Sequence, residues 1–429
     1  EFGHIKAWEK EDVIEPGKPN AAGWLLPTKH NLHRRYPEVA ILIPDTIGRA
    51  CGGLCVSCQR MYDFQSGNLN FNLEKLKPKE DSWAVKLKKL MDYFENDTQL
   101  RDILITGGDA LMNTDSSLKK ILDAVYNMAI RKKEANKKRP DGEKYAEMLR
   151  VRLGTRLPVY IPQRITPELI SILKEFKNKA SKIGIKQFVI QTHFESPLEV
   201  TPIVKESIKK LLSAGWIVTN QIVFTTSCAR RGHTAKIRKI LNDIGVLSYY
   251  TFSVKGYLEN KHNFATNARA IQEQIEEKNI GKIPVSKRNK IIEMASDAEN
   301  MIENINSLRT ELKTPYLATD RNVLNLPGVG KSLTFRVIGI TSEGRRILEF
   351  SHDATRWHSP IIHKMGKVII IESKSMGELL RQLNEIGEDT HQYISTYGYS
   401  AGSTEERMSI YEYPEYDYNV TEKMTNIKI

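Results

Sequence analysis

Three of the four cysteines in the chain, Cys51, Cys55 and Cys58, lie within eight residues and form a Cys-x3-Cys-x2-Cys motif. Four cysteines in 429 residues are too few for a disulfide framework, so reduced thiols that bind a metal are the better interpretation. A structural zinc site needs four protein ligands; Cys228 or a histidine could be the fourth, and zinc therefore remains an alternative. A 4Fe-4S cluster bound by three thiolates instead leaves one iron open to a small molecule, which is a catalytic arrangement.

Six apolar segments alternate with helical patterns, which predicts an α/β fold with a parallel sheet. We expect the sheet to curl into a partial (β/α)6 barrel, which has its chemistry at the carboxyl ends of the strands. The predicted strands are residues 38–46, 102–108, 150–160, 187–194, 216–224 and 247–255.

Residues whose side chains could take part in binding or catalysis lie at the ends of these strands. The cysteines follow the first strand, and Gly107, Gly108 and Asp109 follow the second. His193 ends the fourth strand and Lys255 ends the sixth. Because the carboxyl ends of parallel strands meet at one edge of a sheet, the sequence predicts a single site there.

The patterns divide the chain into four parts. Residues 1–37 form an N-terminal segment, and residues 38–258 form the barrel. Residues 259–313 are charged and helical without a strand pattern, which predicts a helical insertion. Residues 314–429 contain a glycine-rich loop, a hairpin pattern around Ser342 to Gly344 and a helix, which predicts a small C-terminal α+β appendage.

Composition restricts the class of protein. About 40% apolar residues in 429 are enough for a sizeable core. The net charge of +12 is spread along amphipathic stretches and forms no basic stripe, which disfavours nucleic-acid binding. No apolar run approaches the roughly 20 residues of a membrane span, and residues 1–20 lack the apolar run of a secretory signal. We therefore expect a soluble, cytoplasmic protein without a membrane partner.

The cysteine motif together with "TGGDALM" after the second strand resembles the radical S-adenosylmethionine (SAM) enzymes. Further segments between residues 33 and 335 are similar, in the same order, to the lysine 2,3-aminomutase family. They are "RYPEVAILIPDT", "RLGTRLPVYIPQRITPEL", "QTHFESPLEVTP", "TNQIVF" and "PGVGKS". The resemblance implies a barrel of the radical SAM type and three cofactors: a 4Fe-4S cluster, SAM and pyridoxal 5'-phosphate (PLP).

The resemblance also implies roles for the residues at matching positions. The three cysteines would bind the cluster, and Lys331 in "NLPGVGKS" would be the Schiff-base lysine of PLP. Arg60 would bind the substrate α-carboxylate through both oxygens. The positions near SAM are matched by Gly107, Gly108, Asp109, His193 and Gln221, and those near the PLP phosphate by Arg35 and Tyr36.

Three features distinguish this chain from similar sequence patterns. "GVGKS" is not a P-loop, because Asn325 stands where the first glycine of that motif would be. Val39 replaces a second arginine that the family places near the PLP phosphate, and no cysteine follows Cys228. We therefore expect no structural zinc site of the kind that lysine aminomutases often carry.

Two more positions that match the family bear on the identity of the substrate. Lys255 and Asn325 stand where lysine aminomutases have two aspartates that receive the distal ammonium. Two like charges about 4 Å apart cost about 4 kcal/mol at an effective dielectric constant of 20, so lysine should bind poorly. A distal carboxylate would fit instead, and the pattern is most like glutamate 2,3-aminomutase, which moves the α-amino group of L-glutamate to the β-carbon and gives β-glutamate. A snorkelling lysine and a turn asparagine remain the structural alternative.

The implied partners are the amino-acid substrate, an electron donor such as flavodoxin or ferredoxin, and further copies of the chain in a homo-oligomer. Other functions remain open. A 2,3-aminomutase for lysine or another amino acid would share the motifs. A radical SAM enzyme that modifies RNA or protein would share the cluster but would not need Lys331 or Arg60.

Overall fold

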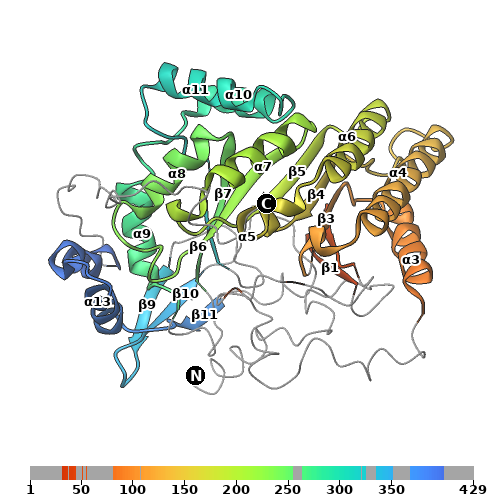
Figure 1. Cartoon of the computed structure of the whole chain (residues 1–429). Coiled ribbons are helices and arrows are strands. Elements are labelled where there is room, and N and C mark those ends of the chain that lie inside the picture. Colours follow the sequence, from red (N-terminus) through yellow and green to blue (C-terminus); the bar gives the residue numbers. More distant parts are fainter. Residues whose placement is uncertain are drawn as a thin grey trace.

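The computed structural model describes residues 31–36, 38–44, 51, 55, 81–106, 108–254, 263–319, 321–324, 335–350 and 368–400. Its main element is a sheet of eight strands that follow one another in chain order (Figure 1). The first two strands are antiparallel, and every later pair of neighbours is parallel. The strands are β1 (Leu32–Tyr36), β2 (Val39–Leu42), β3 (Asp102–Ile105), β4 (Arg150–Gly154), β5 (Gln187–Thr192), β6 (Ile217–Val223), β7 (Val246–Val254) and β8 (Arg321–Leu324).

The α/β class and the six predicted parallel strands are confirmed, and the six strands are β2 to β7. Two strands were not predicted, because β1 ("LHRRY") and β8 ("RNVL") are short and carry charged residues instead of an apolar run. β8 extends the parallel sheet to a seventh strand. Within the described residues β1 and β8 do not pair with each other, so this sheet is open there.

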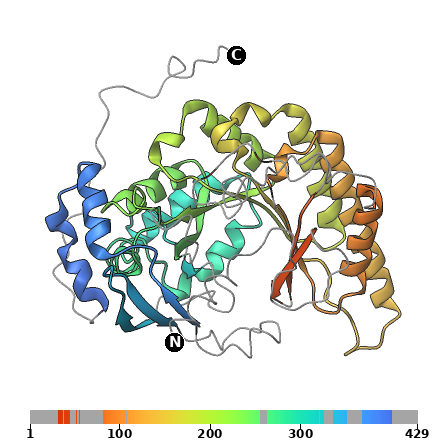
Figure 2. The same ribbon diagram turned by 90° about the horizontal axis from the view of Figure 1, so that it is seen from below.

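Within the described residues, the longer helices between the strands β2 to β7 form an arc along the outside of the sheet (Figure 2). They are α3 (Trp83–Asn96), α4 (Asp115–Lys137), α6 (Pro167–Lys182), α7 (Pro202–Ser213) and α8 (His233–Asp243). Three of them follow a threonine whose hydroxyl accepts a hydrogen bond from a backbone N–H in the first helical turn. These threonines are Thr114, Thr166 and Thr201. Such caps satisfy an N–H group that the helix itself leaves without a partner, so local sequence determines where these helices begin.

The main core lies between these helices and the sheet. Trp216, directly before β6, is fully buried there, with its ring centroid 6.1 Å from that of Phe176 and 5.6 Å from that of Phe188. Its indole N–H donates to the carbonyl oxygen of Leu173 at 3.0 Å. Because buried aromatic rings contribute much of the burial free energy of a core, this cluster fixes α6 against β5 and β6.

The region predicted as a helical insertion contains α9 (Asn267–Glu276), α10 (Arg288–Met294) and α11 (Met301–Leu312). α11 contacts α8 on the outside of the sheet. The chain then returns to the sheet as β8, where Leu324 is the parallel partner of Val254 in β7. Two strand ends that lie far apart in the sequence are therefore neighbours.

The described residues of the C-terminal part contain a second, antiparallel sheet and two helical segments. The predicted hairpin is present as β9 (Phe335–Ile340) and β10 (Arg346–Phe350), and Gly344 provides the positive φ (76°) of its turn. β11 (Val368–Ile371), α13 (Met376–Glu385) and the 3-10 segment η7 (Thr390–Ser400) follow. Leu379 and Tyr393 share a buried cluster with Phe224 and Ala268, so these helical segments pack against α9 and the end of β6.

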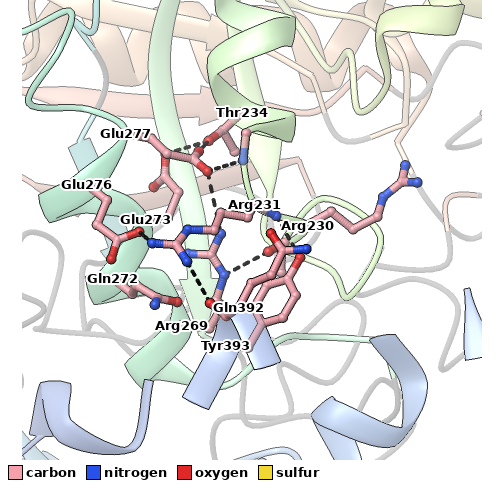
Figure 3. Close-up of polar contacts among 12 residues, drawn as sticks. Arg230, Arg231, Thr234, Arg269, Gln272, Glu273, Glu276, Glu277, Gln392 and Tyr393 are labelled. Carbon is pink, nitrogen blue, oxygen red and sulfur yellow. Dashed lines mark hydrogen bonds and ion pairs between the residues drawn. The ribbon is translucent and has the colours of Figure 1, made fainter. Parts of the chain in front are cut away.

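A buried network of polar and charged groups fixes this docking (Figure 3). Arg231, between β6 and α8, donates to the Glu276 carboxylate at 2.8 Å and to the Gln392 carbonyl oxygen at 2.7 Å. The Tyr393 hydroxyl accepts from the Arg231 N–H at 2.8 Å and donates to Glu388 at 2.6 Å. Buried charges are costly unless they are paired, so the network favours one docked position for the C-terminal helical segments.

In the ranges described above, no helix combines the length and the apolar content that crossing a membrane requires.

Candidate active site

Asp109 lies at the carboxyl end of β3 and organises the segment that follows it. One carboxylate oxygen accepts from the Leu111 N–H at 3.0 Å, and the other accepts from the Arg156 N–H at 2.7 Å. The Tyr160 hydroxyl lies 3.5 Å from the second oxygen. Burial raises the pKa of Asp109, while hydrogen bonds from Thr155 and the nearby N–H groups oppose this shift. The carboxylate therefore joins the loops after β3 and β4.

Arg156 follows β4 and links these loops to one of the cysteines. Its Nη1 donates to Sγ of Cys55 at 3.0 Å, its Nε donates to the His193 carbonyl oxygen at 2.9 Å, and its Nη2 donates to Glu199 at 2.5 Å. Burial lowers the pKa of Arg156, but Glu199 and Cys55 outweigh this effect and raise it. The guanidinium is therefore a permanent positive charge beside the thiol.

Tyr160 lies near the same group of residues. Burial and then the negative charges of Asp109, Cys51 and Cys55 raise the pKa of its hydroxyl. Tyr160 is therefore a neutral phenol at the edge of the site near both described cysteines. Cys51 itself is exposed and Cys55 is half-buried.

His193 lies at the end of β5, and Gln221 lies in the neighbouring parallel strand β6. His193 directly follows β5, and its imidazole hydrogen-bonds the backbone of Gln221 in β6. Burial, and then the nearby Arg156 charge, lower the pKa of His193 to about 4. The imidazole is therefore neutral around pH 7 and can act as a donor or an acceptor, depending on its tautomer.

Glu195 is a second acid at this edge that the sequence did not single out. Both carboxylate oxygens accept from the Val223 N–H, at 3.2 and 3.0 Å. The Cys228 thiol donates to the Glu195 carbonyl oxygen at 3.2 Å, and His233 contacts the same oxygen at 2.7 Å. Burial, and then the nearby Glu199 charge, raise the pKa of Glu195 to about 8, although Val223 and Arg156 oppose the shift.

The raised pKa of Glu195 predicts a pH-dependent stability. The pKa is 4.5 in the unfolded chain and about 8 in the folded one, so between these values the folded state holds a proton that the unfolded state has lost. The stabilisation that Glu195 contributes is therefore fully present below pH 4.5 and is lost as the pH rises through about 8. We expect Glu195→Gln to gain up to about 1.4 kcal/mol over the wild type for each pH unit in this window.

Urea denaturation of both proteins at about pH 5.5 and about pH 7.5 measures this difference. His193 and His233 have a lowered pKa of about 4, so they reduce stability as pH falls below 6.5. Both histidines are present in both proteins and cancel in the comparison. A constant difference between the two pH values would show that Glu195 is ionised in the folded state.

Several predicted site residues lie outside the described part of the chain. They are Cys58, Arg60, Gly107, Lys255, Asn325 and Lys331. Arg35 and Tyr36 belong to the backbone of β1, and their side chains are not described. Among the described residues no group of three His, Cys, Asp or Glu side chains is arranged to hold a metal, and the cysteine motif is only partly included there. The three-cysteine ligand set therefore stays a prediction.

The strand ends nevertheless bear on two of these positions. β7 ends at Val254, one residue before Lys255, and β8 ends at Leu324, one residue before Asn325. Val254 and Leu324 are partners in the parallel register. The last described residues before the two predicted substrate positions are therefore neighbours on the same edge of the sheet.

The described residues also fit an iron-sulfur ligand set chemically. The Arg156 guanidinium places a positive charge and an N–H donor at the Cys55 sulfur, where a thiolate that ligates a cluster would carry its negative charge. Arg156 and Tyr160 lie inside the range predicted for the third strand, 150–160, but β4 ends at Gly154 and Leu157–Tyr160 form a short helix. The predicted strand was therefore too long, and for this reason the strand-end rule did not single these two residues out. Glu195 directly follows the fourth predicted strand, so the same rule could have singled it out, whereas the position of Glu199 depends on the capped turn that follows β5.

Comparisons with known proteins agree with the motifs. No family model matches the chain. It is 29% identical over 371 residues to an uncharacterized KamA family protein of Methanocaldococcus jannaschii, which covers 85% of this chain and 48% of that protein. It is 29% identical over 265 residues to glutamate 2,3-aminomutase of Clostridioides difficile, which covers 60% of this chain and 51% of that enzyme. It is 31% identical over 257 residues to L-lysine 2,3-aminomutase of Acetoanaerobium sticklandii, which covers 58% of this chain and 49% of that enzyme.

The chain is therefore similar to proteins named as glutamate and lysine 2,3-aminomutases. The resemblance read from the motifs is therefore confirmed. The chain spans about half the length of these curated relatives. Glutamate and lysine enzymes are similar to it to nearly the same degree, so identity alone does not distinguish the two substrates.

Proposed function

We propose that this chain is a radical SAM and PLP-dependent 2,3-aminomutase that converts L-glutamate to β-glutamate, and that its sheet is a partial barrel of the radical SAM type. The Arg156–Cys55 contact beside Asp109 and His193 carries the radical SAM part of this proposal. Through these contacts Arg156 brings the carboxyl ends of β3, β4 and β5 together with Cys55. Its relatives named as glutamate and lysine 2,3-aminomutases support the reaction type.

Cys51, Cys55 and Cys58 would hold the cluster, and Lys331 would hold PLP. Gly107, Gly108, Asp109, His193 and Gln221 would surround SAM, and Arg35 and Tyr36 would lie near the PLP phosphate. When bound, the cluster and SAM supply a radical that removes hydrogen, and PLP supplies a π system that lets nitrogen move between carbons. The protein's own part is to orient the substrate and to exclude water. An external one-electron donor of the flavodoxin or ferredoxin kind would supply the electron.

Substrate orientation would come from both ends of the amino acid. Arg60 would bind the α-carboxylate through a bidentate pair. Lys255 would pair with the distal carboxylate, and Asn325 would donate its amide N–H to it. The adjacent ends of β7 and β8 support this assignment, because one carboxylate needs both residues at the same place. A distal ammonium would instead meet the positive charge of Lys255.

Parallel incubation of the reconstituted protein with L-glutamate and L-lysine tests the function. We expect β-glutamate from the first and little product from the second, with a difference of up to about a thousandfold for a charge mismatch worth about 4 kcal/mol. Lys255→Asp should lower glutamate turnover selectively. Conversion of lysine without conversion of glutamate would favour a lysine 2,3-aminomutase, whose relative is equally similar to the chain.

A further inference from the structure

Arg156 lies where three loops of the candidate active site meet, and each part of its guanidinium has a different partner. Nε donates to the His193 carbonyl oxygen at 2.9 Å, Nη2 to Glu199 at 2.5 Å, and Nη1 to Sγ of Cys55 at 3.0 Å. Its backbone N–H donates to Asp109 at 2.7 Å. Main chain and side chain are thus both fixed.

Glu199 is fixed as well. Its second carboxylate oxygen accepts from the backbone N–H groups of Glu195 at 2.6 Å and Ser196 at 3.1 Å, within a capping box. The side chains of Arg156 and Glu199 are only 21% and 24% exposed. A planar guanidinium held at two points loses little further freedom when it bonds a third group, so its remaining donor is preorganised toward the sulfur.

We propose that Arg156 is a positioning residue that raises the reduction potential of an iron-sulfur cluster bound through Cys55. This inference rests on the proposed function, because it requires the cluster. Reduction transfers one electron from an external one-electron donor to the oxidised cluster and adds one negative charge to the cluster and its thiolates. An N–H donor and a positive charge at a ligating sulfur stabilise that added charge.

Glu199 has the opposite effect on the same equilibrium. Its carboxylate neutralises part of the guanidinium charge and thereby limits the stabilisation of the reduced cluster. The pair therefore predicts opposite changes for two single substitutions, which a loss of structure alone would not produce. Loosening of the site would instead lower cluster content in both variants.

The experiment is an anaerobic redox titration of the reconstituted full chain with dithionite and mediators, read by the electron paramagnetic resonance signal of the reduced cluster. At the potential where half of the wild-type clusters are reduced, the ratio of reduced to oxidised cluster should fall about tenfold in Arg156→Met, which is about 59 mV for a one-electron couple. Glu199→Gln should raise this ratio. Arg156→Lys keeps the positive charge, so its ratio of reduced to oxidised cluster should lie between those of the wild type and Arg156→Met.

An unchanged midpoint in Arg156→Met with full iron content would overturn the inference, as would shifts of Arg156→Met and Glu199→Gln in the same direction. Should Arg156→Met lose its cluster, Arg156→Lys and Glu199→Gln decide the question by the signs of their shifts. A wild-type chain that binds no cluster would refute the proposed function itself, and this outcome is separate from an unchanged potential.

Discussion

Replacement of Cys55 by alanine is expected to abolish both the iron-sulfur absorption of the reconstituted protein and any aminomutase turnover. Two of the three predicted ligands cannot hold a cluster that already leaves one iron open. Arg156 also loses the sulfur that accepts its Nη1 donor at 3.0 Å. The measurements are iron and acid-labile sulfide content, the visible absorption band, and product formation from L-glutamate, with turnover falling to the level of a blank.

Two variants serve as controls for this prediction. Cys228→Ala removes a thiol that is buried against Glu195 and is not part of the motif, so iron content should be unchanged. Lys331→Ala should abolish turnover and borohydride-sensitive PLP binding but leave the cluster in place. Full iron content in Cys55→Ala would exclude this cysteine as a ligand, and loss of iron in Cys228→Ala would instead support the alternative in which Cys228 completes a metal site.

The second large effect is on stability and concerns the ion pair between α8 and α9. Arg238 donates to Glu273 at 2.7 Å, and both side chains are fully buried. Thr234 donates to the same carboxylate oxygen at 2.7 Å. Arg238→Met leaves an uncompensated buried carboxylate, for which we expect a loss of about 3–5 kcal/mol in the free energy of unfolding.

Urea denaturation checks this value, and the chain offers a matched control. Arg131 also pairs with a glutamate, Glu95, at 2.7 Å, but its side chain is 49% exposed. Exposed pairs contribute little, so Arg131→Met should cost no more than about 1 kcal/mol. The double substitution Arg238→Met with Glu273→Met should be less destabilised than Arg238→Met alone, because it also removes the Glu273 carboxylate that would otherwise stay buried without the Arg238 guanidinium. Equal effects of the two arginine substitutions would contradict this explanation.

Local sequence was sufficient for the strands that form the centre of the sheet. Apolar, β-branched segments such as β5 and β6 are unfavourable at the surface, which predicts buried strands. The helical patterns between them allow the chain to return in the same direction, which predicts parallel pairing. The strand-end rule then placed Asp109 and His193 at one edge. Both are found there, joined through Arg156.

Sequence by itself therefore determined the order of the parallel strands, the beginnings of the capped helices and the resemblance to the aminomutases, since periodicity, capping and motif spacing act over a few residues at a time. Tertiary structure alone decided which distant groups meet. Arg156 reaches Cys55 across 101 positions and Arg231 reaches Gln392 across 161. The weakly patterned β8 joins β7 only because the insertion returns the chain to the sheet. Such contacts depend on the path of the whole chain, and no local pattern encodes that path.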